Sequence, residues 1–324
     1  MSTFIHASMT FHWIQGDLTS QSNNDCSFLP ANQLVQTRNL KANCLRSLHQ
    51  ILQNPCANWM SVQQEEAIMA IMQRQTDVLV MLKTGGGKSM LAIISTTLLQ
   101  SKEGLVLVLP LKSLMTDWQC KLESMKVAYQ VFNPSVNQGR LRMDINLILT
   151  TVDKARFASW RTALAELNET LRITRLVFDE AHLVLLGQHF RQSMDRITNL
   201  RGDDMQLILL SGTIPPFSEG VIRESFGLLS DTVAIRQNTN CPELEFILEQ
   251  RCDSKLLLAK ATHLINQERQ TWTVQDRGLV FVTYLEDGQN LAAKVSCVII
   301  VMNVFTTLCL IHRQSGHFIM AMKQ

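Results

Sequence analysis

Residues 78–93, VLVMLKTGGGKSMLAI, decide the fold of this chain. The stretch begins with the continuous apolar run of residues 78–82, which is typical of a buried strand, and continues after Ser89 with apolar residues at helical spacing. Three consecutive glycines lie between the two patterns. Because glycine has no side chain, backbone N–H groups there can wrap phosphate oxygens at a helix N-terminus, whose dipole favours anions. The sequence therefore predicts a strand, a phosphate-binding loop and a helix.

The loop residues have separate expected roles in holding a nucleotide. Lys88 is expected to reach the β- and γ-phosphates, and Ser89 is expected to ligate Mg²⁺. The residues that wrap the phosphates are Thr84, Gly85, Gly86 and Gly87. The strict pattern has a glycine where this chain has Leu82, so the alternative is a glycine-rich turn beside a solvated lysine.

The composition is that of an ordinary globular protein with room for two domains. The chain has 324 residues, of which 46% are hydrophobic. Its net charge is only +2, so any contact with nucleic acid has to come from a local basic groove. The eight cysteines form no C-x-x-C pair and no zinc-site spacing, and the N-terminus has no secretory pattern. We therefore expect reduced thiols in an intracellular protein that is neither secreted nor membrane-bound.

Two acidic residues form the second strong signal, in the segment TRLVFDEAHLVL at residues 174–185. A buried strand delivers Asp179 and Glu180 to its carboxyl end, where Asp179 can hold Mg²⁺ through water and Glu180 can polarise the attacking water. His182 can sense the phosphate state. Ser211 and Thr213 follow the next strand, MQLILLSGT, and are the expected coupling partners of His182. A solvated acidic turn is the alternative for the acids taken alone.

Other polar residues follow predicted strands, and one lies on the helix that precedes the phosphate-binding loop. In an open parallel sheet the carboxyl ends of the strands share one edge, which is where ligands bind. Ser113, Asp117 and Thr151 are therefore candidates for contact with a sugar-phosphate backbone, with plain helix capping as the alternative. Gln64 could offer its amide to an adenine edge, or be an ordinary solvated glutamine.

The chain divides into four predicted segments. Residues 1–38 are expected to be a poorly ordered extension, followed by helices over residues 40–52 and 62–73. Residues 39–238 are expected to form the nucleotide-binding domain, with a boundary near residues 236–243. Residues 239–294 begin a second α/β unit. Residues 295–324 change abruptly to an apolar composition of low charge and are expected to be an atypical tail, either retained intron or, alternatively, a membrane segment.

These motifs, in this order, resemble a superfamily 2 helicase of the RecQ type. TGGGKS resembles motif I, PLKSLMTD motif Ia, DEAH motif II, SGTIPP motif III and RGLVFVTY motif IV. The resemblance implies two RecA-like domains, of which the first has a mainly parallel sheet and only the start of the second is present. It also implies ATP with Mg²⁺, 3′ to 5′ movement on DNA, and a nuclear location. It assigns ATP binding to Gln64 and to residues 84–89, and hydrolysis to Lys88, Asp179, Glu180 and His182.

The resemblance also implies where DNA would bind and what this chain lacks. It assigns DNA contacts to Ser113, Asp117 and the segment after DEAH, in which Phe190 and Arg191 are recognisable. No motif V or VI follows Lys294. We therefore expect an incomplete second domain, slow ATP hydrolysis and little unwinding. The alternatives are a non-catalytic ATP-dependent binding module and a motor of different use, such as a restriction-type translocase or an RNA helicase; RNA is the less favoured partner.

Overall fold

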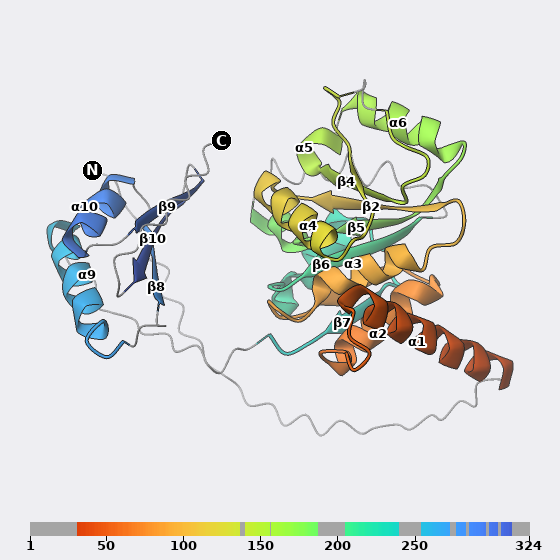
Figure 1. The fold of residues 1–324 in the computed structure, drawn as a ribbon, viewed down its shortest axis with the longest axis horizontal. Helices are drawn as coiled ribbons and strands as arrows, with labels where there is room; N and C mark the ends of the chain where they lie inside the picture. The colour runs from red at the N-terminus through yellow and green to blue at the C-terminus, as the bar shows by residue number, and fades with distance from the viewer. Residues whose placement is uncertain are drawn as a thin grey trace. The chain divides into compact units, whose positions relative to one another are not determined.

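The computed structural model describes residues 31–136, 140–155, 157–186, 205–239, 254–272, 277–282, 285–295, 298–303 and 306–312 (Figure 1). Its contacts divide the chain into two compact units, Met1–Cys241 and Pro242–Gln324, each with its own sheet. The predicted Phe190 and Arg191 contacts lie outside the described residues. The two units are called the first and the second unit below.

The first unit is built on a seven-stranded sheet in which every neighbouring pair is parallel. The order across the sheet is β3-β4-β2-β5-β6-β1-β7. The strands are β1 (Val78–Met81), β2 (Glu103–Leu109), β3 (Gln130–Val131), β4 (Leu147–Thr151), β5 (Arg172–Phe178), β6 (Gln206–Ser211) and β7 (Val233–Arg236). Because all seven run in one direction, their carboxyl ends meet at one edge of the sheet. The predicted α/β fold with a parallel sheet is confirmed.

Helices cover both faces of this sheet, as Figure 1 shows. The helices are α1 (Ala31–Leu52), α2 (Val62–Gln73), α3 (Lys88–Thr97), α4 (Lys112–Ser124), α5 (Val152–Ala155), α6 (Ala158–Asn168) and α8 (Glu219–Ser225), with 3-10 turns η2 (Ala181–Leu186) and η3 (Pro216–Ser218). Alternate residues of β1 belong to different cores: Val78 and Val80 pack with α1 to α4, and Leu79 and Met81 pack with α6 and α8. A strand covered on both faces has to be apolar throughout, which explains the continuous apolar runs in the sequence.

The first helix begins earlier than predicted. The sequence analysis placed its start at residue 40, within a poorly ordered extension up to residue 38, whereas α1 begins at Ala31. Its first turns are rich in polar residues such as Gln33, Gln36 and Arg38, which form helices readily but show no apolar stripe. Periodicity therefore detected only the part of the helix that packs on the core.

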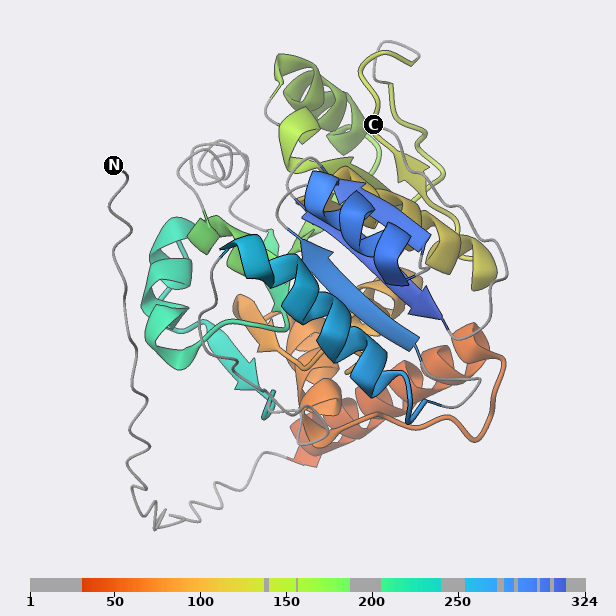
Figure 2. The ribbon, with the colours of Figure 1, turned by 90° about the vertical axis from the view of Figure 1, so that its left-hand side faces the viewer.

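The second unit holds a three-stranded antiparallel sheet of order β8-β10-β9 beside two helices (Figure 2). Its elements are α9 (Ser254–Glu268), β8 (Arg277–Val282), α10 (Leu285–Val295), β9 (Val298–Asn303) and β10 (Thr306–His312). The three strands pair antiparallel, unlike the parallel strands of the first unit. Two of them, β9 and β10, come from the segment expected to be an atypical tail, because its apolar, β-branched runs suit strands. The assignment of this unit as the start of a second RecA-like domain stays a prediction. None of the described helices is long and apolar enough to cross a membrane.

Candidate nucleotide-binding site

The loop between β1 and α3 has the backbone shape that a phosphate cradle requires. Gly85 and Gly87 have φ angles of 77° and 79°, in the left-handed region that glycine adopts without steric cost. The N–H of Gly86 donates to the carbonyl oxygen of Lys83 at 2.9 Å and closes the turn. Gly87 is the N-cap of α3, so the N–H groups of the first helical turn point towards the loop. The predicted strand, loop and helix are therefore all present.

Lys88 lies at the start of α3 with its amine folded over this loop. Its Nζ donates to the carbonyl oxygens of Leu82 at 3.1 Å and of Lys83 at 3.3 Å. The charge of Lys88 also acts on both acids of the DEAH segment, since it lowers the pKa of Glu180 and opposes the rise in the pKa of Asp179. The loop, its lysine and the two acids therefore share one site at the carboxyl edge of the sheet.

Gln64 reaches this loop from α2 in an unexpected way. Only 1% of the residue is exposed, so the alternative of a solvated surface glutamine is wrong. Its Oε1 accepts from the N–H of Met60 at 2.7 Å, and its Nε2 donates to the carbonyl oxygen of Gly87 at 3.2 Å. The amide therefore braces the loop backbone, whereas its contact with an adenine edge stays a prediction.

Asp179 follows β5 and is held at both carboxylate oxygens. Its Oδ2 accepts from the indole N–H of Trp118 at 2.8 Å, and its Oδ1 accepts from the N–H of Glu180 at 3.0 Å. The residue is 9% exposed, and burial raises the pKa of its carboxyl, an effect that the Trp118 hydrogen bond opposes. A buried carboxylate held by neutral donors keeps free lone pairs for a cation.

These residues fit Mg²⁺ in the way that nucleotide sites usually hold it. Magnesium prefers oxygen ligands and is commonly bound by one or two carboxylates together with substrate phosphates, not by a cage of protein ligands. Asp179 offers the carboxylate and Ser89, half-buried in the first turn of α3, offers a hydroxyl. Among the described residues there is no group of three or more His, Cys, Asp or Glu that could hold a metal ion alone. The site therefore suits a metal that arrives with a nucleotide.

A hydrogen-bonded chain leads from Glu180 to the neighbouring strand. The Oε2 of Glu180 lies 3.2 Å from Nδ1 of His182, and that nitrogen lies 3.0 Å from Oγ of Ser211. The same hydroxyl accepts from the N–H of Thr213 at 3.2 Å. The contact with His182 lowers the pKa of Glu180, which favours the ionised form of this carboxylate. The structure thus joins four of the six residues that the sequence analysis assigned to hydrolysis and coupling, namely Glu180, His182, Ser211 and Thr213.

The predicted nucleic-acid contacts separate into two groups. Ser113 and Asp117 are exposed on α4, whose N-terminus lies at the same edge of the sheet. Thr151 is only 3% exposed, and its hydroxyl accepts from the N–H of Lys154 at 3.4 Å. For Thr151 this geometry favours the alternative of helix capping, because the hydroxyl is already engaged and shielded.

Two residues of the site had no role in the sequence analysis. One is Trp118, whose bond to Asp179 joins residues that are 61 positions apart. The other is Gln237, whose N–H donates to the carbonyl oxygen of Met81 at 2.8 Å and whose Oε1 accepts from the N–H of Lys83 at 3.4 Å. The rule that strand ends share one edge would have identified Gln237, since it directly follows β7, the neighbour of β1.

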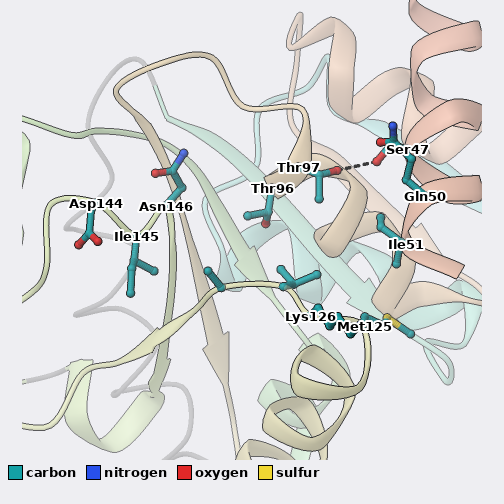
Figure 3. Close-up of a pocket in the computed structure, with 12 residues that line it drawn as sticks. Ser47, Gln50, Ile51, Thr96, Thr97, Met125, Lys126, Asp144, Ile145 and Asn146 are labelled. Atoms are coloured by element: carbon teal, nitrogen blue, oxygen red, sulfur yellow. Dashed lines mark hydrogen bonds between the residues drawn. The ribbon is translucent and has the colours of Figure 1, made fainter. Parts of the chain in front are cut away.

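A separate pocket of about 410 Å³ contains none of these residues (Figure 3). Its lining comes from α1, the end of α3, the segment after α4 and the segment before β4, including Ser47, Thr97, Lys126 and Asn146. The hydroxyls of Ser47 and Thr97 are hydrogen-bonded to each other at 2.6 Å. Because β4 begins just after Asn146, the pocket lies towards the amino ends of the strands, away from the nucleotide loop.

Comparison with known proteins shows which proteins this chain resembles. Residues 61–219 match the DEAD/DEAH box helicase family. The ATP-dependent DNA helicase Q5 of Rattus norvegicus is 32% identical over 149 residues, which are 43% of this chain and 15% of the rat protein. Two solved structures of the DUF1998 helicase MrfA share the fold. The one bound to DNA has a TM-score of 0.51 at 16% identity and covers 68% of this chain and 34% of that one. The other has a TM-score of 0.57 at 15% identity, with coverages of 76% and 40%.

The matches therefore span less than half the length of each of these relatives. The residues that match the family model include the nucleotide loop, the DEAH segment and the Ser211–Thr213 turn. The resemblance to helicases predicted from the sequence is confirmed, because residues 61–219 match the model of the DEAD/DEAH box helicase family.

Proposed function

We propose that this chain carries the ATP-hydrolysing motor of a RecQ-type DNA helicase, which uses ATP with Mg²⁺ to move 3′ to 5′ along DNA. The observation that carries the proposal is the hydrogen-bonded chain from Glu180 through His182 to Ser211. A phosphate-binding site that only held a nucleotide would not need a relay from its hydrolytic acid to the next strand. The match to the DEAD/DEAH box helicase family and the DNA helicase relative support the same assignment.

The residues of the site divide the chemistry among them. The loop N–H groups and the helix N-terminus bind the phosphates, and the Lys88 amine exchanges its carbonyl partners for phosphate oxygens. Mg²⁺ bound with the nucleotide would neutralise charge that develops on the phosphate oxygens. Asp179 would hold that ion through water. Glu180 is ionised and orients the attacking water, and His182 relays the change to Ser211 and Thr213.

We propose that nucleic acid lies along the exposed face of α4, against Ser113 and Asp117. Contacts there would go to the sugar-phosphate backbone, which fixes position but carries no sequence information. We propose that this nucleic acid is DNA and not RNA, because the sequences of motifs I and Ia resemble those of RecQ helicases. Nuclear residence is proposed on the same resemblance alone.

One observation favours a second candidate, a nucleotide-dependent binding module without translocation. The sheet of the second unit is antiparallel, with β10 between β8 and β9, so it differs from the parallel sheet of a RecA-like motor domain. In P-loop motors an arginine supplied from outside the first domain contributes about 10³ to 10⁵ in rate. We therefore propose that this chain hydrolyses ATP slowly and unwinds little DNA.

Steady-state ATP turnover with and without single-stranded DNA tests the proposal, with Glu180→Gln as the control. The proposal expects slow turnover that disappears in Glu180→Gln while nucleotide binding remains. Turnover that is indifferent to Glu180→Gln would favour the binding module. Strong stimulation by single-stranded DNA would contradict the proposed slow rate and show a complete motor.

A further inference from the structure

Trp118 is a buried side chain whose polar atom is directed at the nucleotide site. It lies on the inner face of α4, one turn before Leu122, and only 2% of it is exposed. The rest of its ring packs in the core beneath the helix. An indole has one polar group, an N–H that can only donate, and a buried donor needs an acceptor. Here the acceptor is Oδ2 of Asp179, at 2.8 Å.

This bond and a second one fix the plane of the Asp179 carboxylate. The other oxygen, Oδ1, accepts from the N–H of Glu180 at 3.0 Å, and the N–H of Asp179 itself donates to the carbonyl oxygen of Val108 at 3.2 Å. An ionised carboxylate has about four acceptor positions, so two remain free after these bonds. The indole therefore orients the group without occupying the positions that a hydrated cation needs.

Helix α4 carries both a charge that acts on Glu180 and the residues proposed to contact nucleic acid. The Nζ of Lys121 lies 5.7 Å from the centre of the Trp118 ring, and its charge lowers the pKa of Glu180. Ser113 and Asp117 are exposed on this helix. One short helix thus joins the proposed nucleic-acid face to the carboxylate through the buried ring of Trp118.

We propose that Trp118 is a positioning residue that holds the Asp179 carboxylate in the orientation required to bind Mg²⁺ with the nucleotide. The inference rests on the proposed function of the site as an Mg–ATP site. Hydrogen bonds from outside the ligand shell typically tune metal affinity by about 10- to 100-fold. A phenylalanine at this position would fill the core almost as well. Trp118→Phe therefore tests the loss of the indole N–H with little loss of packing.

The test measures binding of methylanthraniloyl-ATP to the full chain by fluorescence anisotropy, first in EDTA and then during a Mg²⁺ titration. In EDTA, Trp118→Phe is expected to bind the nucleotide as the wild type does. In the titration, it is expected to need an Mg²⁺ concentration at least about tenfold higher to reach half of the Mg²⁺-dependent change in anisotropy. Trp160→Phe is the matched control, because Trp160 is also 2% exposed and packs edge-on against the ring of Phe132.

The outcomes distinguish failure of the proposed role of Trp118 from failure of the proposed function of the site. A wild-type Mg²⁺ midpoint in Trp118→Phe overturns the inference and leaves the proposed function intact. Equal loss of binding with and without Mg²⁺ also overturns it, because the ring would then only pack. Absence of nucleotide binding by the wild-type chain overturns the proposed function, and the inference with it. If Trp118→Phe fails to fold, 3-benzothienylalanine at position 118, which keeps the shape and lacks the N–H, gives the deciding midpoint.

Discussion

An alanine at position 87 would collide with the amide that braces the nucleotide loop. A Cβ built on Gly87 falls well inside contact distance of Nε2 of Gln64, whereas a Cβ on Gly85 meets no atom within 4 Å. Both glycines have nearly the same left-handed φ, 79° and 77°. The pair therefore separates the backbone cost of replacing a left-handed glycine from the cost of losing the Gln64 contact.

The expected magnitudes follow from the two costs. A left-handed backbone conformation costs an alanine about 1–2 kcal/mol. Alanine also reduces the conformational entropy of the unfolded chain, which offsets part of this cost, so Gly85→Ala should lower the free energy of unfolding by about 1 kcal/mol. Gly87→Ala also displaces the Gln64 amide from the carbonyl of Gly87 and the N–H of Met60. Buried polar groups left unpaired cost about 1–3 kcal/mol, so we expect a total near 3 kcal/mol for Gly87→Ala.

Thermal unfolding followed by circular dichroism measures the difference. For a unit of this size, about 2 kcal/mol corresponds to a melting temperature lower by roughly 4–8 °C in Gly87→Ala than in Gly85→Ala. Gln64→Ala removes the amide, so Gly87→Ala made in that background should cost no more than Gly85→Ala. Equal melting temperatures for the two glycine variants, or no coupling to Gln64, would refute the reasoning.

Three other predictions concern ionisable side chains that are buried or paired. Burial alone would raise the pKa of Glu219, but hydrogen bonds from Arg236 and Arg223 lower it. Its stabilising effect is therefore present at neutral pH and lost below about pH 4, so Glu219→Gln should lower the melting temperature at pH 7 more than at pH 3.5. Burial lowers the pKa of Arg175 from 12.5 to about 10, so its charged form is disfavoured in the fold and Arg175→Met should raise the unfolding free energy in urea by about 1–3 kcal/mol. Burial raises the pKa of the Cys44 thiol to about 11, so peptide mapping after iodoacetamide treatment at pH 8 should find it unmodified until the chain unfolds.

Each of these has a contrary result that would count against it. A pH-independent effect of Glu219→Gln would show that its arginine contacts contribute nothing. A marked loss of stability in Arg175→Met would mean that the hydrogen bond of its guanidinium to Ser95, at 3.4 Å, outweighs the burial of its charge. Modification of Cys44 as fast as that of exposed Cys56 would place its thiol near solvent.

The sheet of the first unit could be predicted from the sequence because its strands are covered on both faces. Such strands are continuous apolar runs, and ligand-binding residues follow directly after them. Asp179 after β5 and Ser211 at the end of β6 were found for this reason. The chain from Glu180 to Thr213 was predictable in outline, since its members follow neighbouring strands.

Contacts made by core side chains could not be predicted in the same way. Trp118 has the helical spacing of an ordinary core residue, and nothing in that spacing tells which acceptor its N–H will find 61 positions away. The sequence also cannot tell whether a glutamine such as Gln64 turns its amide towards a ligand or towards the backbone. The antiparallel pairing of β8 with β10 depends on long-range register that apolar runs do not encode.

Direct calorimetric titration of the full chain with Mg–ATP tests the central claim, that this edge of the sheet is a nucleotide site. We expect saturable binding by the wild type. Lys88→Ala should weaken it by about tenfold or more, since a charged hydrogen-bonding group contributes about 1.5–3 kcal/mol. Lys83→Ala, which removes an exposed lysine from the same loop, should bind nearly as the wild type does. No binding by the wild type, or equal losses in the two lysine variants, would contradict the account.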